Sequence, residues 1–256
     1  MAFPVIALAA LAVTLSACRQ AGENAPDAQP AADLHNVLSA AEENAGWRLL
    51  FDGESTAEWR GYNSDTFPDR GWRVESGQLI VEQSGTEEAG LGGDIVTDES
   101  FASFELKLDF MLSDTANSGI FYRVIENPDE AIWNNAPEYQ LLDDSVYIAM
   151  GTMDMTTHLT GDNYDLHAAV TRPAVPVGEW NSARIIVDGS HVEHWLNGEK
   201  TVEYEFWSPD WEARVAASKF AEFPAYGRTQ TGPIGLQDHG HEVRFRNIKV
   251  RTLPAE

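Results

Sequence analysis

Large apolar side chains occupy every second position between residues 104 and 112, and this alternation constrains the fold more than any other feature of the chain. The five positions are Phe104, Leu106, Leu108, Phe110 and Leu112. Successive side chains of a strand point to opposite faces of the sheet, so these five share one face. Residues 101–112 are therefore predicted to form a β-strand, with the alternating positions from Phe104 onward against a hydrophobic core.

Further short strand candidates recur along the chain, separated by Gly, Asn and Asp. They are residues 47–53, 71–82 (a hairpin), 94–97, 117–123, 137–144, 179–198 (a second hairpin), 232–240 and 243–250. Only two helices are predicted, at 210–220 and at 39–45, where Ser39 and Glu42 have the spacing of a capping box. Many short strands and few helices favour an all-β sandwich.

The N-terminal residues resemble an export signal. An apolar run at 4–17 is too short to span a bilayer comfortably, and it ends in the sequence L-S-A-C at 15–18. That ending is similar to a bacterial lipobox, in which Cys18 is lipidated and becomes the mature N-terminus. No Lys or Arg precedes the run, and an ordinary signal peptide cut near the same place is the alternative.

Residues 1–17 are thus expected to be a lipoprotein signal peptide. Residues 18–37 are rich in Ala, Pro, Gln and Asp and predict a flexible tether, which leaves 38–254 as the folded domain. We expect an exported lipoprotein in the cell envelope of a Gram-negative-type bacterium, at the periplasmic face or the outer membrane. Cys18 is the single cysteine of the 256 residues, so an intrachain disulfide is impossible.

The charge balance narrows the range of partners. Lys and Arg number 17 and Asp and Glu number 41, which gives a formal net charge of −24. Phosphate binding needs clustered cations, so no nucleic-acid partner is expected. Contact with a membrane is expected only through the N-terminal lipid anchor. A neutral ligand, such as an oligosaccharide or another glycoside, suits this charge. The eight Trp residues are compatible with sugar stacking, although core packing explains Trp more often.

Two adjacent strand candidates, 117–123 and 137–144, carry polar residues in alternation. In the first, Arg123 shares a face with Gly119, and in the second Glu138 shares a face with Gln140. If both polar faces open into one groove, a cation, a carboxylate and an amide converge there and could hold a sugar or a metal ion. An ion pair on a solvated face is the alternative interpretation.

Other candidate site residues lie further along the chain. Gln237 and His239 alternate on one strand candidate, and His239 is suited to proton transfer or metal binding, although a structural histidine is the alternative. The irregular insertion 145–178 carries Tyr164. Substrate contacts are predicted for Gln140, Asp143, Tyr164, Lys219 and Gln237. For Asp143 and for Lys219, a turn and an exposed helix end are the respective alternatives.

Seven segments, in order, resemble one known family. They are L-S-A-A-E-E-N-A-G-W-R-L-L-F-D-G (38–53), N-S-G-I-F-Y-R (117–123), E-Y-Q-L-L-D (138–143), G-E-W-N (178–181), H-W-L-N-G (194–198), G-P-I-G-L-Q-D-H-G (232–240) and F-R-N-I-K-V (245–250). Together they resemble the 3-keto-disaccharide hydrolase family, also catalogued as domain of unknown function 1080, over residues 38–252. The resemblance implies a concanavalin A-like jelly roll of two antiparallel sheets, and export that is often as a lipoprotein.

The resemblance also implies action on glycosides whose sugar carries a ketone at C3. Such a ketone acidifies the proton on C2, so a base can remove it and the glycosidic oxygen can leave C1 by β-elimination. Addition of water then completes a net hydrolysis. We assign Glu138, His239 and Arg123 as catalytic, with Arg123 stabilising the enolate.

Cofactor and partner expectations follow from this chemistry. One divalent metal ion of open identity, held by Glu138 and His239, could polarise the ketone. A nucleotide cofactor is not expected. A separate sugar-oxidising oxidoreductase must supply any 3-keto substrate. Two other functions stay open: a non-catalytic lectin-like sandwich, and an ordinary endoglucanase, for which the chain lacks an E-x-D-x-x-E run.

Overall fold

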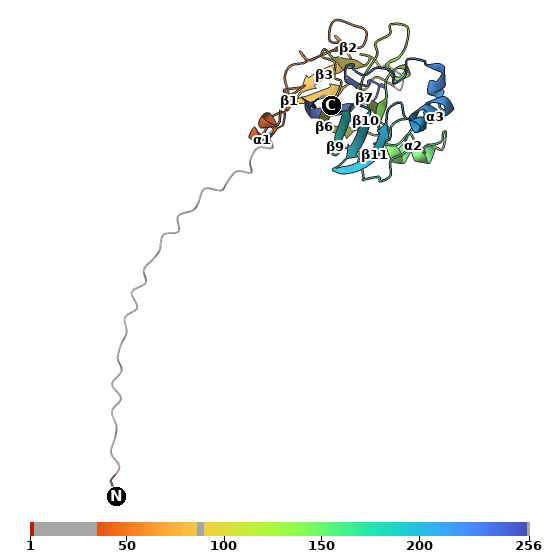
Figure 1. The fold of residues 1–256 in the computed structure, drawn as a ribbon. Coiled ribbons are helices and arrows are strands. Elements are labelled where there is room, and N and C mark those ends of the chain that lie inside the picture. The colour runs from red at the N-terminus through yellow and green to blue at the C-terminus, as the bar shows by residue number, and fades with distance from the viewer. Residues whose placement is uncertain (3–34, 86–89, 255–256) are drawn as a thin grey trace. The chain divides into compact units, whose positions relative to one another are not determined.

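The computed structural model describes residues 1–2, 35–85 and 90–254. From residue 35 onward they belong to one compact unit, which is built from two antiparallel sheets and a few short helices, as predicted (Figure 1). The apolar run at 4–17, Cys18 and most of the predicted tether lie outside the described residues.

The larger sheet carries most of the strand residues. Its order is β11 (Glu199–Glu205), β10 (His191–Leu196), β9 (Asn181–Asp188), β6 (Phe104–Leu112), β13 (Val243–Thr252), β4 (Gln78–Val81) and β3 (Trp72–Glu75), and β1 (Arg48–Leu49) also pairs with β13. The predicted hairpins correspond to β3–β4 and β9–β10, which are joined by tight turns. The most strictly alternating segment, β6, begins at Phe104, three residues later than the predicted strand 101–112, and lies at the centre of this sheet.

The smaller sheet carries the predicted polar strands. Its order is β2 (Trp59–Gly61), β5 (Ile95–Thr97), β12 (Gly235–Leu236), β7 (Asn117–Phe121) and β8 (Glu138–Leu142). Several of these strands are shorter than predicted. Only two residues of the predicted strand 232–240 pair as a strand, and β7 ends at Phe121 rather than at residue 123.

The hydrophobic core fills the space between the two sheets. The five alternating apolar residues of β6 are all at most 2% exposed, and Ile120, Tyr139 and Leu141 of the smaller sheet belong to the same cluster. Burial of each large side chain of this kind stabilises the fold by about 1.5–3 kcal/mol. One face of each strand in the smaller sheet is thereby committed to the core, so its polar residues lie on the outer face.

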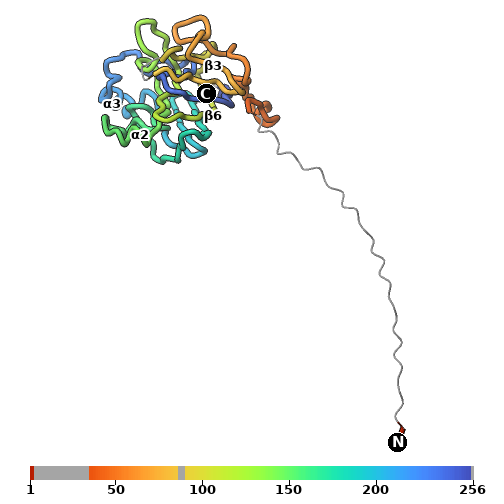
Figure 2. The backbone as a smooth tube through the Cα atoms, turned by 180° about the vertical axis from the view of Figure 1, so that it is seen from behind, coloured from red at the N-terminus to blue at the C-terminus, as the bar shows by residue number. Residues whose placement is uncertain are grey.

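The helices of the described residues are short. They are α1 (Ala40–Asn44), η1 (Ile132–Asn134), α2 (Asp144–Met150), α3 (Pro209–Ala217) and η2 (Lys219–Glu222). Ser39 and Glu42 form the predicted capping box at the start of α1. In Figures 1 and 2, α2 and α3 lie close together at the end of the sandwich opposite α1. No helix of the described residues is long and apolar enough to cross a membrane.

The ordered chain begins before residue 38. The Asn36 amide donates to Asn247 Oδ1 at 2.6 Å, and the Asn247 amide donates to Asn36 Oδ1 at 2.7 Å. Asn247 has a φ of 53° and lies where the register of β13 shifts, so Asn36 satisfies a backbone group that the bulge leaves without a ladder partner. Residues 35–37, predicted as the end of the tether, are therefore part of the fold.

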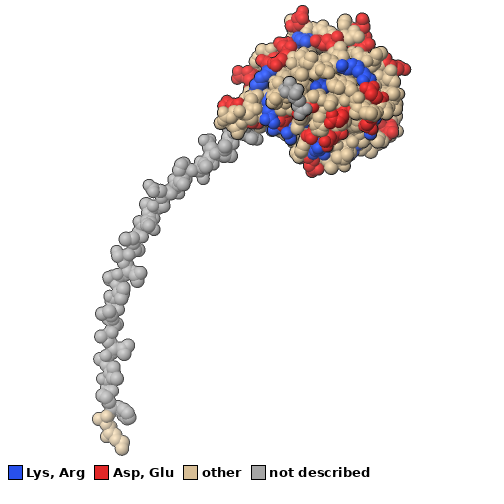
Figure 3. Space-filling view, viewed as in Figure 1, with Lys and Arg blue, Asp and Glu red and all other residues tan. Residues whose placement is uncertain are grey.

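Charged side chains of both signs mix on the surface. On the face shown in Figure 3, Lys and Arg lie among Asp and Glu residues. Arg73, for example, pairs with Glu75, Glu82 and Glu242. Exposed pairs of this kind contribute about 0–1 kcal/mol each to stability.

Candidate active site

A polar cavity of about 180 Å³ lies on the outer face of the smaller sheet. Tyr139 and Leu141 of β8 point into the core, so Glu138 and Gln140 point the other way. Residues that pair across strands share a face, and Gly119 of β7 pairs with Gln140. The cavity is lined by Asn117, Trp133, Glu138, Gln140, Tyr164, Lys219, Gln237 and His239.

Six of these eight residues were predicted from the sequence, and the structure brings them together. They are Glu138, Gln140, Tyr164, Lys219, Gln237 and His239. Asn117 and Trp133 were missed. Asn117 alternates with Gly119 on β7, so its position on the polar face was readable from the sequence. Trp133 belongs to η1, a single turn whose sequence has no periodic signal.

The absence of a side chain at Gly119 leaves space for the side chain of Glu138. A Cβ atom at Gly119 would lie 2.2 Å from Glu138 Oε1 and 2.7 Å from Glu138 Cδ, far inside contact distance. The Gln237 amide donates to the Gly119 carbonyl at 3.0 Å, and Ser118 Oγ donates to the Gln237 carbonyl at 2.9 Å. The Glu138 side chain therefore packs directly against the backbone of β7 at Gly119, in space that a side chain at residue 119 would occupy.

Lys219 supplies a cation at the wall of the cavity. Its Nζ lies 4.1 Å from the ring centroid of Trp133 and 4.4 Å from that of Tyr164, and it donates to the Tyr164 hydroxyl at 3.3 Å. An ammonium between two aromatic faces is held by the ring quadrupoles as well as by hydrogen bonds. This contact between Lys219 and Tyr164 places a positive charge in the same cavity as Glu138, Gln140 and His239.

The ion pair between His158 and Asp165 holds Tyr164 in position. His158 Nε2 lies 3.2 Å from Asp165 Oδ1, and the His158 ring packs edge-on against Tyr164 with the centroids 4.7 Å apart. Burial acts to raise the pKa of Asp165, but the hydrogen bonds from His158 and from the Lys219 amide outweigh it, so this pKa is lowered. The Asp165 carboxylate therefore stays ionised and anchors the loop that carries Tyr164 to the start of η2.

Four residues of the lining carry buried polar atoms that need a partner. Asn117 Oδ1, Trp133 Nε1, Gln237 Oε1 and His239 Nδ1 make no hydrogen bond within residues 35–85 and 90–254. Buried polar atoms in folded proteins are nearly always paired, and each unpaired one costs about 1–3 kcal/mol. Several such atoms around one cavity indicate a site built to hydrogen-bond a polar ligand.

Arg123 does not belong to this site, and the expectation that it shares the groove is wrong. Strand β7 ends at Phe121 and Arg123 has a φ of 51°, so the alternation that would place it beside Gly119 is broken. Its guanidinium is buried and donates to the carbonyls of Ala102 at 2.8 Å and Gly189 at 2.6 Å. Arg123 therefore joins loops of the fold and does not line the cavity.

Asp143 was predicted to contact substrate, but the structure gives it a structural position. It is the N-cap of α2, and its carboxylate accepts hydrogen bonds from the Ser145 hydroxyl and from the amides of Val146 and Thr115. A capping carboxylate of this kind typically contributes about 1 kcal/mol to helix stability. Asp143 does not line the cavity.

The described residues contain one group of at least three side chains with the geometry of a metal site. It consists of His191, Glu193 and Glu203, whose ligand atoms lie within 4.8 Å of one another on the outer face of the larger sheet. The Lys200 ammonium already bonds to Glu193 at 3.2 Å and to Glu203 at 2.5 Å, so it neutralises this cluster. This group is not the predicted pair, and a metal ion at Glu138 and His239 stays a prediction.

The fold and the cavity define a jelly-roll protein with a sugar-sized polar site on one sheet, and comparison with known proteins is consistent with that class. Residues 46–251 match the family model described as a 3-keto-α-glucoside-1,2-lyase-like domain. A 3-keto-disaccharide hydrolase from Bacteroides thetaiotaomicron is 36% identical over 229 residues, which cover 81% of this chain and 79% of that protein. The chain belongs to the 3-keto-disaccharide hydrolase family, as its sequence motifs indicated.

Solved structures agree with this assignment. A crystal structure from Parabacteroides distasonis, provisionally named a glycosyl hydrolase, superposes with a TM-score of 0.77 at 35% identity and covers 86% of this chain and 100% of its own. A second crystal structure from the same organism, with the same provisional name, has a TM-score of 0.60 at 29% identity and covers 81% and 99%. The predicted jelly-roll class is confirmed.

Proposed function

We propose that this protein cleaves 3-keto-glycosides by β-elimination across C1–C2 followed by hydration, which together amount to hydrolysis. The observation that carries the proposal is the cavity itself, in which a carboxylate, an imidazole and an ammonium lie among unpaired amide groups. Family membership supports the substrate class, and the family description names a lyase acting across positions 1 and 2.

The reaction needs a base near C2, a group that stabilises negative charge on the C3 oxygen, and a proton donor for the departing oxygen. A base takes the proton from C2, and the electron pair forms an enolate with the C3 oxygen. The enolate re-forms the ketone as the C1–O bond breaks, and the departing oxygen takes a proton. Water then adds at C1 of the resulting enone and C2 regains a proton, so one glycosidic bond and one water are consumed. An ordinary glycosidase instead needs two carboxylates at a fixed separation.

We assign these roles to residues of the cavity. Glu138 is the base at C2, because it contributes the carboxylate of the cavity lining and its side chain is positioned against the backbone at Gly119. The Lys219 ammonium stabilises the oxyanion that develops at C3. His239 protonates the departing oxygen and then orients the water. Asn117, Gln140 and Gln237 bind the remaining hydroxyl groups.

A divalent metal ion fits the donors present. Glu138 offers a carboxylate, His239 an imidazole whose Nδ1 is unpaired, and Gln237 an amide oxygen that is also unpaired within the described part of the chain. In this alternative arrangement, Glu138 and His239 would hold the ion in place of their acid–base roles, with Gln237 completing the set. When bound, it would polarise the ketone and an adjacent hydroxyl group.

The decisive experiment is incubation of the purified protein with a 3-keto-disaccharide and with the same disaccharide unoxidised. We expect cleavage of the 3-keto sugar alone, with a transient enone seen by ultraviolet absorbance or NMR. Glu138→Gln and His239→Ala should each lower kcat by about 10²–10⁴-fold, the range for a positioned acid or base, while the circular dichroism spectrum is retained. Equal rates on oxidised and unoxidised sugars would refute the keto-specific mechanism.

Metal dependence is tested separately. If an ion takes part, EDTA abolishes turnover and one divalent ion restores it, and Glu138→Gln and His239→Ala both lower the binding of that ion in calorimetry. Turnover that is unaffected by thorough chelation would remove the ion from the proposal and leave the acid–base assignments in place.

A lectin-like binding function is the second candidate, because jelly rolls host both classes. The amide-rich lining of Asn117, Gln140 and Gln237 favours it. A pure binding protein would hold 3-keto and unoxidised sugars without consuming either, and Glu138→Gln would leave the affinity for both nearly unchanged. Isothermal titration with both sugars distinguishes the two functions.

We also propose that the mature protein is a lipoprotein of the cell envelope that acts on sugars oxidised by a separate oxidoreductase. The L-S-A-C sequence at 15–18 and the composition of 18–34 support an anchored, tethered domain. Metabolic labelling with a fatty acid tests it: the native chain should carry label, and Cys18→Ala should not. Unlabelled native protein recovered in the soluble periplasmic fraction would point to an ordinary signal peptide.

A further inference from the structure

A second cavity, of about 510 Å³, lies beside the smaller sheet, where β2 ends at Gly61 and residues 92–94 lead into β5. Three segments form it: residues 61–69, 92–94 and 130–132. Aromatic and apolar side chains, including Tyr62, Phe67 and Ile132, alternate with hydrogen-bonding ones, including Asn63 and Asp69. A lining of this composition is typical of sites that bind uncharged, hydroxylated rings.

This second cavity shares a wall with the active-site cavity in η1. Ile132 lines the second cavity, and its chain neighbour Trp133 lines the first. The Ile132 side chain is fully buried, and its Cδ1 would lie 2.9 Å from a Cβ atom at Gly235 of β12. Ile132 therefore rests on the middle strand of the sheet and separates two hollows on either side of it.

The two cavities are also joined along a second edge. Asp238 lies between Gln237 and His239, which both line the active-site cavity. One oxygen of the Asp238 carboxylate accepts from the Gly92 amide at 2.9 Å, and the Asp238 amide donates to Asp94 Oδ1 at 2.9 Å. Gly92 and Asp94 line the second cavity. The two cavities therefore adjoin at two places. At one, Asp238 lies between them, and at the other they are lined by the neighbouring residues Ile132 and Trp133.

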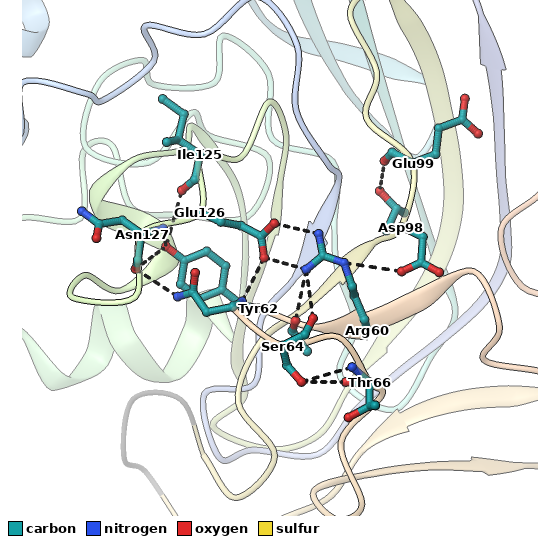
Figure 4. A network of polar contacts seen from close by, with 12 residues as sticks. Arg60, Tyr62, Ser64, Thr66, Asp98, Glu99, Ile125, Glu126 and Asn127 are labelled. Atoms are coloured by element: carbon teal, nitrogen blue, oxygen red, sulfur yellow. Dashed lines mark hydrogen bonds and ion pairs between the residues drawn. The ribbon is translucent and has the colours of Figure 1, made fainter.

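The segment that leads to η1 is fixed to β2 by a polar network (Figure 4). Arg60 donates to both oxygens of Glu126, at 2.6 Å and 2.7 Å, and its Nε lies 3.4 Å from Asp98. The hydrogen bond and charge of Glu126 raise the pKa of Arg60, and Arg60 lowers that of Glu126. The Tyr62 hydroxyl accepts from the Asn127 amide at 3.1 Å. The second cavity is therefore largely preformed.

We propose that the second cavity binds the leaving-group sugar of a 3-keto-disaccharide while the oxidised ring occupies the active-site cavity. This inference rests on the proposed function and deepens it, because it predicts a preference for a disaccharide over a glycoside with a small aglycone. The aromatic rings of Tyr62 and Phe67 offer faces for a pyranose ring, and Asn63 and Asp69 offer partners for its hydroxyl groups. The acidic rim suits a neutral sugar and disfavours an anionic group.

The test compares two substrates in a variant that fills the second cavity. Ala131 lines this cavity and is only partly buried, so Ala131→Trp adds bulk there without touching the active-site cavity. We expect kcat/KM for a 3-keto-disaccharide to fall at least tenfold, while kcat/KM for methyl 3-keto-glucoside stays within twofold. Ala57→Trp, an exposed site away from both cavities, is the matched control and should change neither value.

Each outcome decides the inference. Loss of activity on both substrates alike, or on neither, would overturn it. If Ala131→Trp does not fold, as judged by circular dichroism, Asp69→Ala at the exposed rim replaces it, with a selective loss of at least threefold on the disaccharide expected. Wild-type protein that cleaves neither 3-keto substrate would refute the proposed function, and the inference with it, whereas wild-type cleavage without selective loss refutes the inference alone.

Discussion

Glu138 occupies space that exists because residue 119 has no side chain. A Cβ atom at Gly119 would lie 2.2 Å from Oε1, 2.7 Å from Cδ and 2.8 Å from Cγ of Glu138. These two residues lie on the paired strands β7 and β8, on the face that forms the active-site cavity. The position of the Glu138 carboxylate therefore depends on the absence of a side chain at residue 119.

This relationship predicts that Gly119→Ala displaces the carboxylate and leaves the fold intact. The clashing atoms belong to a flexible side chain, so Glu138 can move, but its carboxylate then leaves its position against the backbone at residue 119. We expect kcat to fall about 10²-fold, the cost of misplacing a catalytic group by about 1 Å. Steady-state kinetics and thermal unfolding measure both effects. A fully active Gly119→Ala enzyme would show that the position of Glu138 is unimportant.

Lys219→Met should show how much of the role of Lys219 in catalysis depends on its positive charge and how much on its packing against the aromatic rings. Methionine keeps an unbranched apolar side chain between Trp133 and Tyr164 but removes the ammonium. Loss of a group that stabilises an oxyanion typically costs about 10²–10³-fold in kcat, and we expect a loss of that size with little change in KM. Lys200→Met, on the outer face of the other sheet, is the matched control and should retain full activity. Unchanged kcat in Lys219→Met would exclude an electrostatic role.

Arg123→Met should affect stability and not catalysis. The variant leaves the carbonyls of Ala102 and Gly189 without their charged donor. Hydrogen bonds to charged groups contribute about 1.5–3 kcal/mol each, so we expect the free energy of unfolding to fall by about 2–4 kcal/mol. Urea titration measures that loss, and kcat per folded molecule should stay within twofold. A large fall in kcat at unchanged stability would restore Arg123 to the active site.

Buried His194 should make the fold sensitive to acid. Burial lowers the pKa of His194 to about 3, against 6.5 in an unfolded chain. Its Nδ1–H donates to the Gly161 carbonyl at 3.3 Å and its Nε2 accepts from the Tyr122 hydroxyl at 2.8 Å, so the native ring is neutral. Between pH 6.5 and pH 3 the unfolded state binds the extra proton, and stability falls by about 1.4 kcal/mol per pH unit.

His194→Gln should remove this acid dependence. Urea unfolding at pH 7 and pH 5 measures it: the wild type should lose about 2 kcal/mol more than the variant between the two values. Ala57→Gln, at an exposed position, keeps the buried histidine and adds no titrating group, so it should retain the wild-type loss. Equal pH dependence in wild type and His194→Gln would contradict the lowered pKa.

The sequence predicted the fold class and much of the site because both depend on alternation. Period-two patterns locate strands and sort their residues between faces, so β6 covers the alternating residues 104–112 and Glu138 and Gln140 face the cavity. Arg123 was misplaced because alternation fails where the backbone turns to positive φ, and that turn leaves no trace in the pattern. Trp133 was missed because η1 is a single turn held by tertiary contacts.

Asp143 shows a second limit of the sequence. Its carboxylate was equally suited to a ligand or to the start of a helix, and the choice depended on α2, which the irregular pattern after residue 144 did not reveal. Lys219 and Tyr164 come from segments without periodicity, and their chemical character alone indicated a role in the site. Side-chain chemistry thus identifies candidates, whereas their convergence depends on packing between distant segments.

Successive residues of strand β8 contribute alternately to the core and to the site. Tyr139 and Leu141 point into the core, and Glu138 and Gln140 point into the cavity. One inserted residue before this strand would exchange the two sets, placing a carboxylate in the hydrophobic interior and an aromatic ring in the cavity. A substitution at an outward position therefore changes the site and leaves the core packed, whereas a change in the length of this segment would disturb the core and the cavity together.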